Sequence, residues 1–370
     1  MLIKSNKTVA VAMSGGVDSS VSAIILKNRG YSVIGVSMHL ISKDINASAG
    51  LKTCCSTEDI IDAKRVCVKI GIPHFVINLE NEFKTAVIDR FVSEYLGGKT
   101  PNPCILCNCL MKFDLLLKRI KELGAVSLAT GHYARITRNK EGKYFLLKSK
   151  DLSKDQSYVL YNLTQENLKE IMFPVGNLNK TQTRKIADDA GFGGISGKKD
   201  SVEICFVPDK DYSGFIKKFS ENLPDAQLNN LNKGLIKNLK GETIGEHNGI
   251  FNYTVGQRKK LGISSKSPLY VVKISAEDNE IIVGDLEDCL SDTLTVKDFN
   301  FINPEDKNRL DKMTTAAKIR YSSPGYKCKA SVSQDGSVKI VFDAKVKFIT
   351  PGQSAVLYSG NKVIGGGVIV

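Results

Sequence analysis

The stretch TVAVAMSGGVDSS, residues 8–20, decides the fold of this chain. Its first half, Thr8–Met13, is an apolar run typical of a buried strand, and Val17–Asn28 follows with helical spacing. The two glycines between them let the backbone come close to a ligand. The start of the helix offers N–H groups and the positive end of the helix dipole, which suit a phosphate. The pattern predicts a strand, a phosphate-binding turn and a helix.

This turn is not a standard P-loop, because no Lys follows the glycines in the pattern GxxxxGK[ST]. The hydroxyls of Ser14, Ser19 and Ser20 can add donors to a phosphate. Asp18 falls in the first helical turn and would repel a phosphate unless a cation such as Mg²⁺ bridged the two. The alternative is a tight strand-to-helix turn in which Asp18 only begins the helix.

The rest of the first third continues this alternation of strand and helix. Apolar, β-branched runs predict strands at Tyr31–Met38, Pro73–Leu79 and Ala125–Thr130, and amphipathic spacing predicts helices at Glu58–Ile70, Glu82–Leu96 and Cys109–Leu123. Such alternation is typical of an α/β, Rossmann-like, doubly wound parallel sheet with helices on both faces. Ligands of such sheets bind at the carboxyl ends of the strands.

The last third predicts a small antiparallel β-barrel. Short alternating segments are separated by Gly, Pro, Asn or Asp, and they lie at Leu269–Ile274, Glu280–Val283, Thr293–Lys297, Thr314–Arg320, Lys327–Ser333, Val338–Phe342, Ser354–Tyr358 and Val363–Val370. We therefore expect a catalytic domain over residues 1–205, a small central domain over 206–280 and a C-terminal β-barrel over 281–370. The Asn/Lys-rich stretch Asn222–Lys240 indicates a surface excursion.

The charge balance points to an anionic partner. The chain has 52 Lys+Arg against 39 Asp+Glu, a net charge of +13. Nucleic acid is the first candidate and a membrane surface the second, while solvated lysines are the plain alternative. No apolar run approaches the ~20 residues of a membrane span, and no secretory signal is apparent, so we expect a cytoplasmic protein. With no Trp and 7% aromatic residues, recognition of a folded RNA by shape fits better than base stacking.

Nine cysteines in a cytoplasmic chain rarely form structural disulfides. Cys104 and Cys107 lie in Thr100–Asn108, where two prolines predict a rigid loop leading into a helix. A helix start would favour the thiolate of Cys107, and nearby lysines would favour that of Cys205. A four-cysteine zinc site is a poor match, because no second pair has the required spacing.

Residues 14–20 resemble the pyrophosphate loop of the ATP-pyrophosphatase superfamily, whose members split ATP to activate a carbonyl oxygen as an adenylate. Further motifs follow in one order: Thr100–Asn108, Met111–Phe113, Gly131–Arg135, Lys154–Tyr158, Ile204–Phe206, Gly245–His247, Gly256–Lys259, Arg320-Tyr321 and Thr350–Ser354. Together they resemble the tRNA-specific 2-thiouridylase family over essentially the whole chain.

The resemblance implies an enzyme that uses ATP and Mg²⁺ to adenylate the C2 oxygen of the wobble uridine in tRNA. A cysteine persulfide then supplies sulfur, and AMP leaves. The implied ATP site comprises Ala12, Met13, Ser14, Gly15, Gly16, Val17, Asp18, Ser19, Met38 and Gly131. The implied contacts with tRNA or its target base are Asn102, Pro103, Cys104, His132, Lys154, Asp155, Gln156, Arg320, Tyr321 and Gln353.

The same resemblance makes Cys107 the nucleophile and Cys205 the persulfide carrier, with a disulfide between them after sulfur release. The sulfur donor would be a persulfide carrier protein or inorganic sulfide. One residue departs from the family, because many members carry Asp, proposed as an acid/base group, where this chain has Cys104. A thiol replaces that group only if its pKa lies near ambient pH.

Three cysteines leave a second mechanism open. Cys104, Cys107 and Cys205 could instead ligate a [4Fe–4S] cluster whose open iron binds hydrosulfide.

Two other classes of protein also remain open. A ligase of the same superfamily would share the glycine turn but would not need these cysteines. A non-catalytic RNA-binding or iron–sulfur protein would not need the turn. Single residues have structural alternatives as well: Met38 and His132 as core residues, and Arg320 as the partner of a barrel carboxylate. The basic turn Gln257–Lys260 is either solvated or follows a phosphate backbone.

Overall fold

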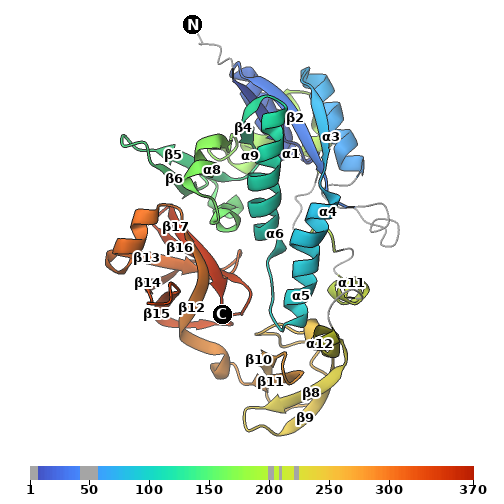
Figure 1. The fold of residues 1–370 in the computed structure, drawn as a ribbon, viewed down its shortest axis with the longest axis vertical. Coiled ribbons are helices and arrows are strands. Elements are labelled where there is room, and N and C mark those ends of the chain that lie inside the picture. The colour runs from blue at the N-terminus through green and yellow to red at the C-terminus, as the bar shows by residue number, and fades with distance from the viewer. Residues whose placement is uncertain (1–6, 42–56, 199–203, 208–210, 221–224) are drawn as a thin grey trace. The chain divides into compact units, whose positions relative to one another are not determined.

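The computed structural model of the chain describes residues 7–41, 57–198, 204–207, 211–220 and 225–370 (Figure 1). The adjacent pair Cys54-Cys55 and residues 199–203 lie outside the described residues. The chain divides into two compact units. The first comprises Met1–Ala86, Cys104–Lys210 and Asn361–Val363, and the second comprises Val87–Pro103, Asp211–Gly360 and Ile364–Val370.

The first unit contains the predicted parallel sheet. Its strands are β1 (Thr8–Ala12), β2 (Ser32–His39), β3 (His74–Asn78), β4 (Ala125–Ala129) and β7 (Ile171–Met172), in the order β3-β2-β1-β4-β7. Every neighbouring pair is parallel. The strand order reverses at β1, which pairs with β2 on one side and with β4 on the other.

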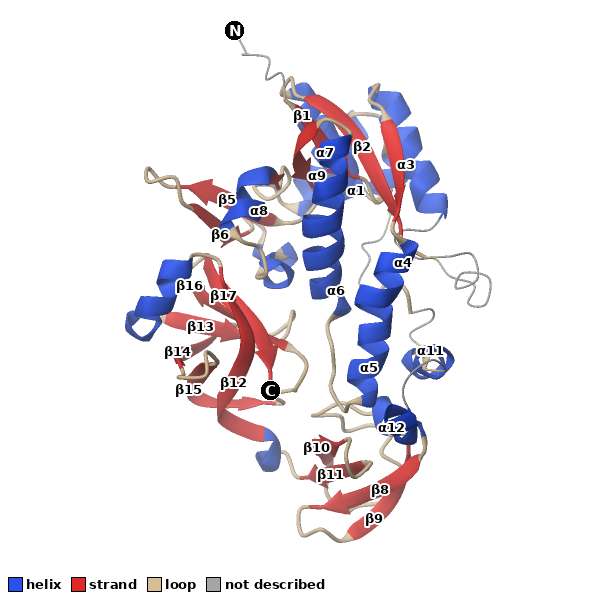
Figure 2. Ribbon diagram, in the orientation of Figure 1, coloured by secondary structure: helices blue, strands red, loops and turns tan. Residues whose placement is uncertain are grey.

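Helices cover both faces of this sheet, so the doubly wound α/β prediction is confirmed. On one face, α1 (Val17–Asn28), α3 (Thr57–Ile70) and α9 (Lys180–Asp189) share a core with Val9 and Val11 of β1. Ala10 lies between these two valines and is fully buried from the opposite face, since side chains alternate along a strand. The helix α7 (Leu117–Glu122) packs against β4. Figure 2 distinguishes the helices from the strands by colour.

Two of the predicted helices contain π-helical segments. The first run consists of α4 (Glu80–Phe83), the π-helix Lys84–Asp89 and α5 (Arg90–Leu96). The second consists of α6 (Pro103–Leu106), the π-helix Cys107–Leu116 and α7. The rigid loop expected at Cys104–Cys107 is therefore wrong, because helix begins at Pro103. Proline suits a helix start, where its fixed φ is already helical and its missing N–H costs nothing.

The remaining elements of the first unit follow β4. They are the antiparallel hairpin β5 (Ala134–Arg138) and β6 (Tyr144–Lys148), the short turns Leu152–Lys154 and Ser157–Leu160, α8 (Gln165–Glu170) and α10 (Gly193–Ser196). Capping boxes begin α8 at Thr164 and α9 at Asn179. Within the described ranges, no helix is long and apolar enough to cross a membrane.

The second unit contains a four-stranded sheet and a β-barrel. The sheet has the order β10-β11-β8-β9, from β8 (Lys233–Asn238), β9 (Thr243–Asn248), β10 (Tyr270–Ser275) and β11 (Glu280–Gly284), preceded by α11 (Tyr212–Phe219) and α12 (Asp225–Leu228). The surface excursion expected at Asn222–Lys240 is wrong where β8 lies, because Ile236 of β8 is fully buried in the core of this sheet.

The predicted barrel is confirmed. Its strands are β12 (Leu290–Phe301), β13 (Thr315–Lys318), β14 (Tyr326–Val332), β15 (Val338–Lys347), β16 (Ser354–Ser359) and β17 (Lys362–Ile369), in the order β12-β15-β14-β13-β16-β17. Pairing of β12 with β17 closes the barrel around Ile340, Leu357 and Ile364.

The packing of α3 on β2 leaves no room beside Gly35, and this can be tested. A Cβ on Gly35 would lie 2.4 Å from Sγ of Cys67 on α3. We expect Gly35→Ala to lower the free energy of unfolding by about 1–3 kcal/mol, the usual cost of overpacking a core. In the double variant Gly35→Ala/Cys67→Ala the clashing sulfur is gone, so most of this loss should disappear. Urea unfolding followed by circular dichroism measures the four-variant cycle, and additive losses would contradict the packing.

Candidate functional site

Two loops meet where the strand order reverses, which is the usual ligand position in such sheets. Residues 13–19 follow β1, and residues 130–132 follow β4. A Cβ on Gly131 would lie 2.7 Å from both the carbonyl carbon of Asp18 and the amide nitrogen of Ser19. The two loops therefore touch through backbone, and only glycine fits at this point. Ala12 ends β1 beside this contact, whereas Met38 is buried near the end of β2.

The glycine turn leaves the start of α1 open. Gly15 has a φ of +69°, and a Cβ there would lie 2.4 Å from the Asp59 carbonyl oxygen. Gly16 is the N-cap of α1, and no side chain caps the helix. The first-turn N–H groups thus lack a side-chain acceptor at the point where an anion would be stabilised. Ser20, one of the expected donors, is buried, and its hydroxyl donates to the Gly16 carbonyl at 2.8 Å.

Asp18 has a protein cation beside it. The ammonium of Lys180 lies 2.9 Å and 2.8 Å from the two carboxylate oxygens of Asp18. The hydroxyl of Tyr133 lies 3.0 Å from Oδ1 of the same carboxylate and 2.9 Å from Oγ1 of Thr183. The sequence suggested that only a bound cation could offset this charge next to a phosphate. The structure instead supplies Lys180, from the first turn of α9.

Tyr133 links this ion pair to the segment Lys154–Gln156. Its backbone N–H donates to Oε1 of Gln156 at 2.9 Å, and the N–H of Gln156 donates to the Tyr133 carbonyl at 2.8 Å. Asp155 is buried and accepts hydrogen bonds from Ser149 and Ser157. Asp155 and Gln156 therefore stabilise the loop itself, while Lys154 is half-buried at the end of a short turn.

His132 is almost entirely buried, between the rings of Phe113 and Phe173. Its Nδ1 lies 2.7 Å from the hydroxyl of Thr130. Burial lowers the pKa of His132 well below 6.5, and the charge of Lys112 lowers it further. His132 is therefore a neutral imidazole at neutral pH. Both interpretations offered by the sequence survive, because this core histidine also directly follows the Gly131 contact.

The three candidate cysteines differ in exposure. Cys104 is exposed, whereas Cys107 and Cys205 are partly buried. Next to Cys205, Phe206 is fully buried and meets the ring of Phe83 edge-on at 5.7 Å. Phe83 ends α4, which packs against the π-helix that begins with Cys107. The segments that carry Cys205 and Cys107 thus both pack against α4.

The structure gives no support for an iron–sulfur cluster. Among the described residues, which include Cys104, Cys107 and Cys205, no three His, Cys, Asp or Glu side chains are arranged to hold a metal ion. Cys109, two residues after Cys107, has a pKa raised by burial and by the charge of Asp114.

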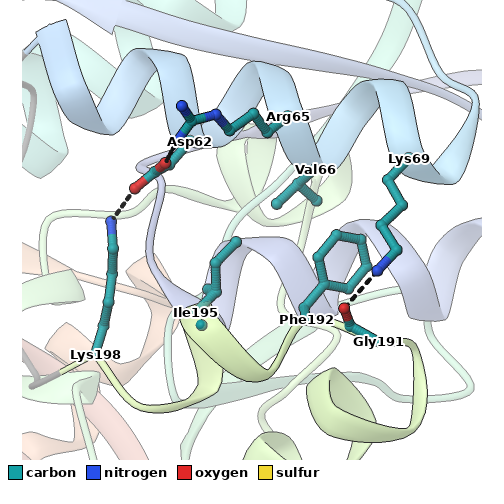
Figure 3. A pocket seen from close by; sticks show the side chains of 9 residues that line it. Asp62, Arg65, Val66, Lys69, Gly191, Phe192, Ile195 and Lys198 are labelled. Carbon is teal, nitrogen blue, oxygen red and sulfur yellow. Dashed lines mark hydrogen bonds and ion pairs between the residues drawn. The ribbon is translucent and has the colours of Figure 1, made fainter.

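A depression of about 400 Å³ lies between α3 and residues 191–198 (Figure 3). Its cations already have partners. Lys198 lies 2.6 Å from Asp62, which also accepts from Arg65 at 2.9 Å, and Lys69 contacts the Gly191 carbonyl. This depression is therefore a junction between two elements and a poor anion site. Lys198 also donates to the Gly15 carbonyl at 3.1 Å, which braces the glycine turn.

The candidate tRNA residues of the second unit surround one turn. The side-chain amide of Gln353 donates to the Thr100 carbonyl at 2.8 Å, and Thr100 lies two residues before Asn102 and three before Pro103. Arg320 donates to the Phe348 carbonyl at 2.9 Å and to the Thr350 hydroxyl at 2.8 Å. Arg320 thus stabilises the turn itself, and Gln353 connects it to Thr100. Tyr321, in contrast, is 44% exposed, with the ammonium of Lys318 5.8 Å from its ring centre.

The residues that contact the carboxylate of Asp18 were not identified from the sequence. Lys180 and Thr183 lie more than 160 residues away from Asp18 along the chain, and no local pattern pairs them with it. Tyr133 stood inside a motif that the resemblance singled out, but without a role. The only local signal for Lys180 was its position just after Asn179, which begins a helix with a capping box.

The burial of His132 predicts a specific loss of stability in acid. In the unfolded chain a histidine has a pKa of about 6.5, so below that pH the unfolded state binds a proton that the buried imidazole does not. The free energy of unfolding should therefore fall by up to about 1.4 kcal/mol per pH unit below pH ~6.5. The variant His132→Gln should show a shallower fall in urea unfolding between about pH 7.5 and 5. Equal slopes in the variant and the wild type would contradict the assignment.

Three family models match the chain in succession: the tRNA methyl transferase HUP domain over residues 7–209, the tRNA methyl transferase PRC-barrel domain over residues 225–285, and the aminomethyltransferase beta-barrel domain over residues 291–369. The tRNA-specific 2-thiouridylase MnmA of Clostridioides difficile is 44% identical, with 98% of each chain covered. That of Clostridium acetobutylicum is 45% identical over 98% of this chain and 99% of its own, and MnmA 1 of Thermoanaerobacter sp. is 46% identical over 99% of both. With its parallel sheet, central sheet and closed barrel, the chain belongs to the tRNA-specific 2-thiouridylase family.

Proposed function

We propose that this protein is an ATP-dependent tRNA 2-thiouridylase, which replaces the C2 oxygen of the wobble uridine by sulfur. The similarity to 2-thiouridylases over 98–99% of the chain carries this proposal. The open helix start at the reversal of strand order supports it, because ATP chemistry needs a phosphate site there. A role in tRNA modification also agrees with a cytoplasmic location.

ATP would place its phosphates against the start of α1. The N–H groups there and the hydroxyl of Ser14 provide donors, and the ammonium of Lys180 offsets the charge of Asp18. Mg²⁺ is usually held by one or two carboxylates together with substrate phosphates. Asp18 is the carboxylate that would hold it, because its Oδ2 accepts only from Lys180 among the described contacts and each carboxylate oxygen has two acceptor sites. Mg²⁺ would neutralise phosphate charge.

The proposed reaction has two stages. In the first, the uridine C2 oxygen attacks the α-phosphorus of ATP, and pyrophosphate leaves. In the second, the terminal sulfur of a persulfide on Cys205 bonds to C2, and AMP leaves with the original oxygen. The thiolate of Cys107 then attacks Sγ of Cys205. The bond to the transferred sulfur breaks, its electron pair stays on that sulfur, and a Cys107–Cys205 disulfide remains.

Either proposed sulfur donor can restart this cycle. A persulfide carrier protein requires that a thiol reductant first reopens the disulfide. Hydrosulfide can instead attack the disulfide at Cys205, which yields the persulfide on Cys205 and the thiolate of Cys107 directly. We favour the persulfide mechanism over the cluster because the described cysteines do not form a metal-holding group. Cys104, exposed in the first turn of α6, remains the candidate acid/base group near the target base.

The two stages can be separated with cysteine variants. We expect Cys107→Ser to keep tRNA-dependent exchange of pyrophosphate into ATP, but to lower 2-thiouridine formation by at least about a hundredfold, because it lacks the thiolate that releases sulfur. Mass spectrometry of digested tRNA measures the product. The matched control is Cys109→Ser, two residues along the same helix, which should keep both activities.

Three outcomes would contradict the persulfide mechanism or the proposed function. Normal thiolation by Cys107→Ser would contradict the persulfide mechanism. Wild-type protein that forms no 2-thiouridine with ATP, tRNA and a sulfur source would overturn the proposed function. Exchange of pyrophosphate into ATP that requires a substrate other than tRNA, and does not depend on tRNA, would favour a ligase of the same superfamily.

The close approach at Gly131 predicts an effect on ATP alone. A Cβ at this position would push the backbone of Asp18 and Ser19 away from β4 and disturb the helix start. We expect Gly131→Ala to raise the KM for ATP about tenfold or more, a cost of about 1.4 kcal/mol, with less effect on the KM for tRNA. The control is Gly194→Ala, since a Cβ on Gly194 meets nothing within 4 Å. An unchanged KM for ATP in a folded Gly131→Ala protein would show that this contact does not shape the site.

A further inference from the structure

The central sheet carries a basic depression that the catalytic site does not use. It has a volume of about 440 Å³ and lies in the loop that leads to β10. Its charged lining consists of Arg258, Lys260 and Lys266, and no acidic residue lines it. Lys259 is exposed beside these three. Four cations thus gather within nine residues.

These four cations are not neutralised by ion pairs within the described part of the chain. Among the described residues, none of the four forms an ion pair, whereas Lys180, Lys198 and Lys237 each do. Of the two serine hydroxyls in the lining that flank Lys266, that of Ser267 lies 3.3 Å from Asp285. No ion pair among the described residues therefore offsets the positive charge of the depression, which favours binding of an external anion.

The backbone of the loop is held in place. The N–H of Gly256 donates to the Val271 carbonyl at 2.8 Å, and the N–H of Val271 donates to the Gln257 carbonyl at 2.9 Å. The side chain of Gln257 accepts from the N–H of Thr254 and donates to the carbonyl of Lys259, both at 3.1 Å. Leu261, the next residue after the cations, is buried in the core of the central sheet. A fixed backbone reduces the entropy lost when the cations bind a ligand.

One residue of the loop has a strained backbone. Lys260 has a φ of +64°, in the left-handed region that side-chain-bearing residues rarely adopt. An ordinary solvated lysine has no need of such a conformation. Strain of this kind persists where the surrounding structure enforces it, and it is common at binding sites. The Lys260 side chain lies in the lining of the depression together with those of Arg258 and Lys266.

We propose that Arg258, Lys260 and Lys266 bind the phosphodiester backbone of the RNA substrate. This proposal rests on the proposed function and adds a contact site to it. The lining has no aromatic side chain on which a base could stack. Arg and Lys side chains without base-reading partners contact phosphates, which position an RNA without reading its sequence. The loop therefore contributes affinity and leaves the choice of uridine to the catalytic unit.

A lipid surface fits this loop less well. Interfacial membrane binding needs exposed apolar side chains beside the cations. Among the described residues 256–269, no large apolar side chain is exposed. Leu261 is buried, and Ile263 packs against the same core. The charge of the loop is therefore not accompanied by a surface that could insert into lipid.

The test is the triple variant Arg258→Gln/Lys260→Asn/Lys266→Gln. Asn replaces Lys260 because it tolerates a positive φ better than Gln does. Each lost phosphate contact lowers the slope of log K against log salt by roughly 0.7–0.9, so three contacts should lower it by about 2. At roughly physiological salt the Kd for tRNA should rise about ten- to a hundredfold. The KM for tRNA should rise in parallel, while the kcat at saturating tRNA stays unchanged.

The matched control removes three cations that have acidic partners. In Lys118→Gln/Arg119→Gln/Lys121→Gln, each lost charge pairs with Asp114, Glu122 or Glu170. This control loses the same formal charge, but its Kd for tRNA and its salt slope should stay near the wild-type values. If the control and the test variant change the Kd for tRNA and the salt slope equally, the effect comes from net charge alone, and the proposal is overturned.

Other outcomes are equally decisive. An unchanged Kd and slope in a test variant that still forms 2-thiouridine would overturn the loop assignment and leave the proposed function intact. A test variant that binds tRNA normally but loses binding to phosphatidylserine vesicles would make the loop a lipid contact. If the wild type binds tRNA through this loop but never forms 2-thiouridine, the proposed function fails and the RNA contact stands.

Discussion

The catalytic unit depends on one backbone contact, in which Gly131 lies against Asp18 and Ser19. This contact joins the loop after β1 to the loop after β4, where the strand order reverses. It also fixes the two residues that follow Gly131. His132 is thereby enclosed by aromatic rings, and Tyr133 is brought to the carboxylate of Asp18. A side chain at position 131 would separate the proposed phosphate site from all of these neighbours.

The ion pair between Lys180 and Asp18 offsets a carboxylate charge that would otherwise repel a phosphate at the start of α1. A carboxylate in the first turn of a helix is stabilised by the helix dipole, but it repels a phosphate bound at the same place. Lys180 offsets that charge from another helix, and Tyr133 contributes a hydrogen-bonding hydroxyl to the same carboxylate. Because Tyr133 is also hydrogen-bonded to Gln156, the network joins the proposed phosphate loop to a segment that the family resemblance relates to tRNA. The proposed site thus occupies one connected set of hydrogen bonds.

Periodic patterns and the glycine turn predicted the sheet, the helices that cover it and the barrel. A strand buried on both faces reads as a continuous apolar run, and an element buried on one face shows regularly spaced apolar residues. The start of the helix at Pro103 was missed, because two prolines also fit an extended loop. Lys180 was missed because its partner is distant along the chain. The resemblance related Gln353 and Arg320 to tRNA, but their hydrogen bonds to Thr100 and Thr350 come only from the fold. Contacts made by polar side chains across such distances have no local signature.

The hydrogen bond from Gln353 to Thr100 spans 253 residues, and it has a consequence for how the chain folds during synthesis. Residues 87–103 belong to the second unit, yet most of their partners there are made long after them. The first unit can form its sheet once residues up to about 210 have left the ribosome. In the early segment, α5 must wait for α11, α12 and residues 250–252, and Thr100 must wait for the barrel. Contacts of such long range form slowly and leave apolar helix surface exposed in the meantime. Phe91, fully buried in the finished protein, is part of that surface, so chaperones would meet this segment on the nascent chain.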